Sequence, residues 1–169
     1  MRHILNLRMA SFPLAVERLR DSSLKSKPVV VCSRHSPRSL ILSASSEARK
    51  EGVFEGQPLT QALQNCRRLV ILPPDTKLYQ KASQEIVSQL SVFSPLVEPG
   101  HWGRFFIDMT GTQRLFGKIQ DAAVQMRQTV SDTLHLSSAL GIASNKLVSG
   151  VASKVVIARN ELYEVPSGS

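Results

Sequence analysis

Two segments far apart in the chain alternate between apolar and polar residues. In residues 4–9 (ILNLRM) and again in residues 104–109 (RFFIDM) every second residue is large and apolar, and Arg8 and Arg104 fall on the other side. Because successive side chains of a β-strand point to opposite faces, this pattern predicts two strands that each bury one face. Other elements must cover that buried face.

Helices are predicted where apolar residues recur every three or four positions. The three long ones begin after Asp75, at residue 119 and at residue 147, and shorter ones are expected at residues 12–20, 45–51 and 59–66. Further strands are expected at residues 28–32, 40–44, 69–72, 138–142 and 163–165. The patterns together predict an α+β fold in which a less regular segment, residues 20–74, forms a small inserted lobe.

The charge of the chain favours a polyanionic partner. Lysine and arginine number 21 against 13 acidic residues among 169, which gives a formal charge of +8 and an isoelectric point near 10.0. Strongly basic domains most often meet nucleic acid. No apolar stretch approaches the roughly 18 residues of a membrane span, and no signal sequence opens the chain, so we expect no membrane partner and a cytoplasmic location.

The cysteines and histidines do not form a metal motif. Cys32 and Cys66 lack paired spacing, which favours two reduced thiols, at least one of them buried. The four histidines are scattered and do not have zinc-ligand spacing.

Five further segments carry ordered motifs. Residues 12–17 (FPLAVE), 27–31 (KPVVV), 46–53 (SEARKEGV), 141–147 (GIASNKL) and 163–166 (YEVP) follow one another along the chain. They resemble, in order and spacing, the F-[FY]-A-x-V-E, K-P-x-x-V, Y-E-A-R-x-x-G-V and G-x-[AS]-x-N-K-x motifs and the last palm strand of Y-family (DinB/UmuC-type) DNA polymerases. The resemblance covers essentially residues 3–166.

The resemblance implies a domain arrangement. A polymerase-type palm, a mixed or antiparallel sheet backed by long helices, is expected over residues 1–19 and 75–166, with a fingers-like lobe over residues 20–74. The thumb and little-finger domains of the family are expected to be absent.

The family's metal-binding acids have no counterpart at the matching positions. The first strand of the family carries D-x-D and the second an adjacent D-E, where this chain has Arg8 and Ala10, then Gly103 and Arg104. Two-metal phosphoryl transfer needs carboxylates, and a guanidinium group stays protonated. We therefore expect no catalytic residue, no magnesium cofactor and a pseudo-polymerase that is not an enzyme.

A relocated acid is the alternative. Asp108 shares a strand face with Arg104, and Glu98 and Glu17 are near in sequence. The family's acid matching Asp108 lies beyond the metal site, so we expect Asp108 to pair with a base or a backbone donor. Pro13 replaces the aromatic residue that acts as sugar gate in the family, which implies altered deoxynucleotide selection.

The phosphate-binding positions of the family are better preserved. The resemblance implies phosphate or nucleotide binding by Ser43, Ser46, Arg49 and Lys146, although a solvated or ion-paired role for the two cations fits the sequence equally well. Together with the two strand arginines these cations predict a basic cleft for a phosphate group or a DNA backbone.

The pattern of losses is similar to that of the ImuB group of mutagenesis proteins. It implies a DNA-binding adaptor in DNA damage tolerance, translesion synthesis and SOS mutagenesis, with a sliding clamp, an error-prone replicative-type polymerase and a RecA-like accessory protein as partners. A divergent but active translesion polymerase is the alternative, and a generic basic nucleic-acid module is a third. Residues 113–116 (QRLF) vaguely resemble a clamp-binding peptide, but an ordinary palm segment is the favoured interpretation.

Overall fold

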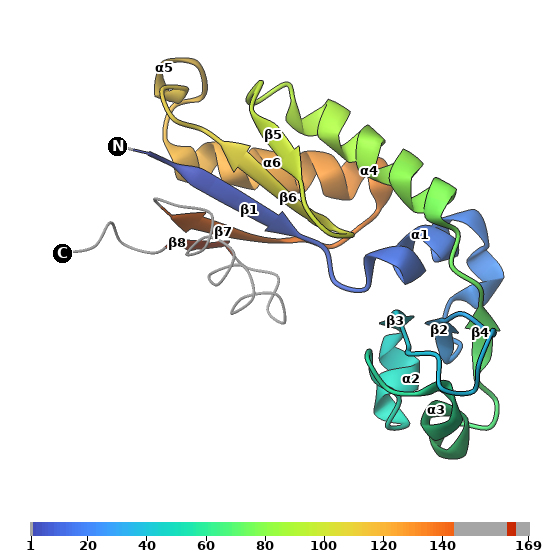
Figure 1. Ribbon diagram of the computed structural model, residues 1–169. Coiled ribbons are helices and arrows are strands. Elements are labelled where there is room, and N and C mark those ends of the chain that lie inside the picture. Colours follow the sequence, from blue (N-terminus) through green and yellow to red (C-terminus); the bar gives the residue numbers. More distant parts are fainter. Residues whose placement is uncertain (1, 144–161, 165–169) are drawn as a thin grey trace. The chain divides into compact units, whose positions relative to one another are not determined.

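The computed structural model describes residues 2–143 and 162–164 (Figure 1). The chain divides into two compact units. The first unit comprises Met1–Ala10 and Lys81–Ser169, and the second comprises Ser11–Gln80. Residues 11–19 and 75–80, assigned above to the palm-like part, therefore group with the second unit.

The first unit is built on a five-stranded sheet with the order β5-β6-β1-β7-β8. The central strand β1 (Ile4–Arg8) pairs antiparallel with β6 (Arg104–Asp108) on one side and with β7 (Ala139–Ala143) on the other. The edge strand β5 (Val97–Pro99) is antiparallel to β6, and β8 (Leu162–Glu164) is parallel to β7. The sheet is therefore mixed, as the resemblance implies.

Helices cover one face of this sheet. Figure 1 shows α6 (Ile119–Leu134) and α4 (Thr76–Leu90) on the same side of the strands, and a short helix, α5 (Gln113–Phe116), precedes α6. Burial alternates along β6, where Phe105 and Ile107 are fully buried and their neighbours are not. The apolar residues of the two alternating strands thus form the core predicted from the sequence.

The second unit packs short elements around a three-stranded sheet with the order β3-β2-β4. Strand β2 (Val29–Val31) pairs antiparallel with β3 (Ser43–Ala44) and parallel with β4 (Val70–Leu72). Helix α1 (Phe12–Arg20) lies against β2 and β3, and the remaining elements are η1 (Ser22–Leu24), α2 (Ser46–Lys50) and α3 (Leu59–Asn65). Its core includes Val30, Ile41, Val53, Ala62 and Cys66.

The α+β fold class is confirmed, with local differences. The strand predicted over residues 40–44 is limited to Ser43–Ala44, because Leu40 makes only an isolated bridge to Pro58. The elements β5, η1 and α5 were not predicted. The helix predicted from residue 147 lies outside the described residues. Within the described part of the chain, no helix is both long and apolar enough to cross a membrane.

A buried carboxylate joins the two ends of the second unit. Glu17 on α1 is buried, accepts a hydrogen bond of 2.9 Å from the hydroxyl of Tyr79 on α4, and forms an ion pair of 2.5 Å with Arg20. Arg20 also bonds Asp75, just before α4. Burial, together with the nearby Glu17 carboxylate, raises the pKa of Tyr79 to about 12, so its phenol is a proton donor at neutral pH.

We expect Tyr79→Phe to destabilise the chain by about 1.5–3 kcal/mol, because it removes a hydrogen bond to a charged, buried group. Urea unfolding at pH 7 measures this loss, and Ser91→Ala, which removes an exposed hydroxyl that bonds only Val87 O, is the matched control. The folded pKa of about 12 exceeds the ordinary 10.0, so this stabilisation is complete below pH 10 and is lost as the pH rises through 12. Equal stability of Tyr79→Phe and wild type would contradict the expectation.

Candidate functional site

The pairing of β1 with β6 places two arginines opposite one another. Arg8 is the register partner of Arg104, and on its other side Arg8 pairs with Ala139 of β7. Directly paired residues share a face of the sheet, so both side chains lie on the face that Phe105 and Ile107 do not occupy. We call this the second face of the sheet.

These positions do not fit a pair of magnesium ions. Nε and Nη2 of Arg8 are buried and have no hydrogen-bond partner, and guanidinium nitrogens are donors that cannot ligate a cation. Ala10 lies just beyond β1 and Gly103 just before β6. Neither residue type has a side-chain oxygen that could ligate a metal ion. The side chains at these four positions therefore offer no ligand to a metal ion.

Gly103 has a backbone conformation that disfavours other residues. Its φ is +78°, in the region that L-residues rarely adopt, and its carbonyl oxygen accepts a hydrogen bond of 2.8 Å from the backbone N–H of Met9. The glycine is thus required by the turn that leads into β6.

The acid that could replace the missing carboxylates is already engaged. Asp108 accepts a hydrogen bond of 3.0 Å from the backbone N–H of Thr110 and lies 3.7 Å from Nε of Arg2. Burial acts to raise the pKa of Asp108, but the bonds from Thr110 and the charge of Arg2 lower it below the ordinary value. The prediction that Asp108 pairs with a base or a backbone donor is confirmed, since it has both contacts.

The other two acids considered for that role lie elsewhere. Glu98 is on the edge strand β5, opposite Phe106, and Glu17 belongs to the buried contact with Tyr79 described above. Among the described residues, no group of three or more His, Cys, Asp or Glu side chains is placed to hold a metal ion.

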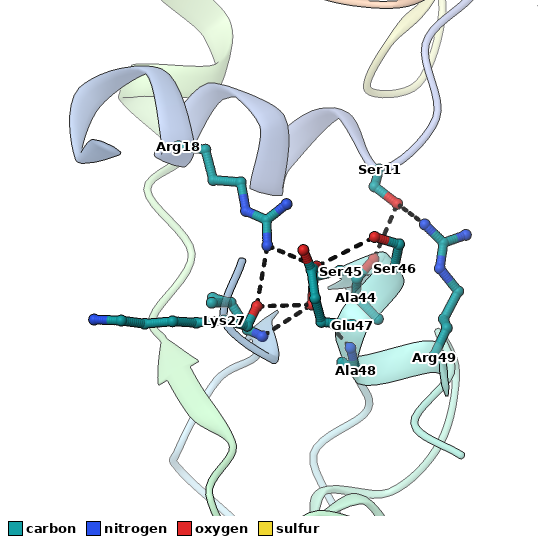
Figure 2. Close-up of polar contacts among 10 residues, drawn as sticks. Ser11, Arg18, Lys27, Ala44, Ser45, Ser46, Glu47, Ala48 and Arg49 are labelled. Atoms are coloured by element: carbon teal, nitrogen blue, oxygen red, sulfur yellow. Dashed lines mark hydrogen bonds and ion pairs between the residues drawn. The ribbon is translucent and has the colours of Figure 1, made fainter. Parts of the chain in front are cut away.

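The start of α2 in the second unit forms a polar group around Ser45 (Figure 2). Oγ of Ser45 accepts hydrogen bonds of 3.0 Å from the backbone N–H groups of Val29 and Ala48. The same hydroxyl is within 3.3 Å of the carbonyl oxygen of Lys27. Ser45 is therefore both the N-cap of α2 and the link between this helix and β2.

An ion pair fixes the same helix from the side of α1. Nη2 of Arg18 donates to Oε2 of Glu47 at 2.9 Å and to the carbonyl oxygen of Lys27 at 3.0 Å (Figure 2). Burial acts to raise the pKa of Glu47, but the hydrogen bond from Arg18 and the bonds near the helix start lower it below the ordinary value.

The predicted phosphate-binding residues are brought together only in part. Ser46 and Arg49 are both exposed on α2, whereas Ser43 is fully buried in β3 and its hydroxyl lacks a hydrogen-bond partner. Lys146 lies outside the described residues. The proposed cleft with the strand arginines joins residues of the two units and stays a prediction.

Sequence reasoning missed Ser11. Nη2 of Arg49 donates to Oγ of Ser11 at 3.1 Å, and this hydroxyl donates to the carbonyl oxygen of Ala44 (Figure 2). Ser11 precedes α1 in a left-handed conformation with φ of 50°. The sequence signal is a serine one residue before the helix start, but its contact with Arg49 requires the tertiary structure. Pro13 is buried in the first turn of α1, where its missing N–H costs no helical bond.

The cysteines behave as predicted. Cys32 and Cys66 are free and buried. Burial raises the pKa of the Cys32 thiol above its ordinary value, which disfavours the reactive thiolate.

Ser45→Ala and Ser46→Ala form a matched pair on one helix. We expect Ser45→Ala to destabilise the chain by about 2 kcal/mol or more, since it leaves two buried backbone N–H groups without an acceptor and removes a helix cap. Ser46→Ala removes an exposed hydroxyl and should change stability by less than about 0.5 kcal/mol. Urea unfolding of both variants checks this, and equal effects would refute the capping role of Ser45.

Comparison with known proteins gives a consistent family. The impB/mucB/samB family model matches residues 7–154. A DNA polymerase IV of Dehalococcoides mccartyi is 32% identical over 99% of this chain and 43% of its own length, and one of Desulfatibacillum aliphaticivorans is 35% identical over 97% and 41%. The chain thus spans less than half the length of these relatives.

Solved structures show the same fold. An insertion ternary complex of Dbh DNA polymerase superposes with a TM-score of 0.83 at 22% identity, over 96% of this chain and 48% of that one. The crystal structure of DinB from Sulfolobus solfataricus gives a TM-score of 0.80 at 22% identity, over 96% and 48%.

Two predictions about catalysis are contradicted by these relatives. The prediction that the chain is not an enzyme is wrong, because proteins similar to almost its whole length are named DNA polymerase IV. The prediction that no cofactor is expected is wrong for the same reason, since DNA polymerases work with pairs of metal ions. The sequence prediction relied on four positions, whereas the similarity to these polymerases extends along almost the whole chain.

The family match and the fold agree. The match covers most of the chain, and the structure has the fold of the solved polymerases. This chain belongs to the impB/mucB/samB family of Y-family DNA polymerases.

Proposed function

We propose that this chain binds DNA and a nucleoside triphosphate as the palm and fingers part of a protein that works in translesion synthesis at damaged DNA. The observation that carries the proposal is the family match over residues 7–154, together with relatives named DNA polymerase IV. The formal charge of +8 supports a nucleic-acid partner, because basic residues release counterions from the phosphate backbone. The location proposed for this work is the cytoplasm.

The exposed start of α2 supports the phosphate contact. Arg49 is exposed, and its guanidinium is oriented by a bond to Ser11, while Ser46 stands exposed on the same helix. A guanidinium fork presents two parallel donors to phosphate oxygens, so a pre-oriented arginine loses little freedom on binding. We assign triphosphate binding to Arg49 and Ser46, and we carry Ser43 and Lys146 over as the other two positions that the resemblance implies.

An adaptor role is the second candidate. Arg8 and Arg104 favour it, because they are paired cations that can contact a DNA backbone. In this role the DNA-bound chain recruits a sliding clamp, an error-prone polymerase and a RecA-like accessory protein, as in the ImuB group and SOS mutagenesis. The exposed Leu115 of α5 is a surface available to such a partner.

Two measurements on the chain test these functions. Fluorescence anisotropy with a labelled primer–template should show binding whose affinity falls steeply and log-linearly with salt concentration. Absence of binding at low salt would exclude both functions. Primer extension with Mg²⁺ or Mn²⁺ and all four deoxynucleotides then separates them: extension supports the polymerase, and binding with recruitment of a partner but no extension supports the adaptor.

Arg49→Ala should weaken triphosphate binding about tenfold or more, the equivalent of losing a charged hydrogen bond of about 1.5–3 kcal/mol. Lys50→Ala is the control, because Lys50 is an exposed cation on the same helix and the change in net charge is identical. Isothermal titration with a nucleoside triphosphate measures both affinities. Equal losses in the two variants would show a general charge effect and contradict the role of Arg49.

A further inference from the structure

The arginine pair of the first unit is a local concentration of charge that the sheet itself does not neutralise. Arg8 and Arg104 are direct register partners on adjacent antiparallel strands, and both side chains are half-buried. Opposed residues of this kind have Cβ atoms about 4.5–5.5 Å apart, and like charges in such pairs destabilise a sheet. A guanidinium group cannot relieve the repulsion by losing its proton.

The acidic residues on the second face do not lie in the same row of the register as the two arginines. In the register, Ile4 and Asp108 form one row, Asn6 and Phe106 the next, and the two arginines the third. Glu98 of β5 lies opposite Phe106 and so belongs to the second row. Asp108 is two residues along from Phe106 and is paired with Arg2. Within residues 2–143, no ion pair involves Arg8 or Arg104.

Hydrogen-bonding capacity is left over as well as charge. Nε and Nη2 of Arg8 are buried and lack any hydrogen-bond partner. Buried donors without an acceptor are costly, and charged ones more so, which makes this arrangement unfavourable unless an acceptor binds. The two nitrogens are separate donors of one planar fork, the geometry that fits two oxygens of a single anion.

The stem of Arg104 is positioned by its neighbour. A Cβ atom at Gly100 would lie 3.4–3.5 Å from the Cβ, Cγ and Cδ atoms of Arg104, which is ordinary van der Waals contact, so the arginine stem passes close beside Gly100. Gly100 N–H also bonds the carbonyl oxygen of Arg104 at 2.8 Å. The turn before β6 thus supports the side chain of Arg104 on the second face.

We propose that Arg8 and Arg104 form an anion site on the second face of the sheet that binds a phosphate group between the two guanidinium forks. The choice of phosphate among anions rests on the proposed function, because DNA and nucleoside triphosphates are the anions this chain is proposed to meet. A tetrahedral phosphate has enough acceptor oxygens to bond both forks and neutralises the repulsion between them. The phosphate belongs either to a DNA backbone or to a triphosphate.

Thermal unfolding with inorganic phosphate tests the site directly. Wild type, Arg8→Met with Arg104→Met, and Arg114→Met are compared in EDTA, in sodium phosphate and in sodium chloride of equal ionic strength. Arg114 is an exposed arginine of the same unit and controls for charge. We expect phosphate to raise the Tm of wild type and of Arg114→Met but not of the double variant, because ligand binding stabilises only a chain that has the site. In chloride the double variant should be at least as stable as wild type, since it lacks the repulsion.

Two further titrations identify the source of the phosphate. If it is a DNA backbone, the double variant loses affinity for a primer–template and its salt slope falls by about 2, one per arginine, while triphosphate binding is unchanged. If it is a triphosphate, the loss is at least about tenfold in triphosphate affinity and DNA binding persists.

The outcomes separate this inference from the proposed function. If phosphate raises the Tm of the double variant as much as that of wild type, the anion site is overturned, even if the chain binds DNA. A phosphate response that depends on the arginines, in a chain that binds neither DNA nor triphosphate, keeps the anion site but overturns the function and the assigned source. Arg8→Lys with Arg104→Lys is a second variant, and it should recover part of the phosphate response because it keeps the charge without the fork.

Discussion

The pairing of β1 with its two antiparallel neighbours is the constraint on which the first unit depends. Its register sets Leu5 against Ile107 and Leu7 against Phe105 in the core, and the same register sets Arg8 against Arg104 on the second face. A slip of one residue would exchange the two faces and expose the core, so burial of the leucines holds the arginines in place. Burial of the apolar side chains thereby keeps the two arginines opposite one another, although their charges repel.

In the second unit, hydrogen bonds position the short elements, where in the first unit a large apolar sheet does so. Its strands have only two or three residues, and α2 has five, so none of these elements is stable by itself. Ser45 bonds α2 to β2, and the Arg18–Glu47 pair bonds α2 to α1. These contacts fix the position of α2 and therefore of Arg49, which belongs to it. Arg49 is therefore oriented by contacts that leave its outer face to solvent.

The sequence predicts those features that depend on local periodicity. The two alternating strands were identified from their period of two, and α6 because its apolar residues recur at helical spacing. The prediction that each strand buries one face holds for β6 but is wrong for β1, where Ile4 and Asn6 on the second face are buried as well. The edge strand β5 was not predicted from the sequence, because it is short, mostly exposed and contains Pro99. At the candidate site, residue types were predictable, but the left-handed Ser11 that holds Arg49 and the exact opposition of Arg8 to Arg104 follow from tertiary structure and register.

The departure from the family's acidic pattern extends into the backbone. A carboxylate at position 8, 10 or 104 requires only a change of side chain, whereas Gly103 has a φ of +78° that an aspartate would adopt only with strain. Its carbonyl oxygen also bonds Met9, at the end of β1, so moving the glycine into an extended conformation would disturb the pairing that aligns the two arginines. Gly103 thus holds the turn before β6 through its bond to Met9, and that turn keeps Arg104 in register with Arg8.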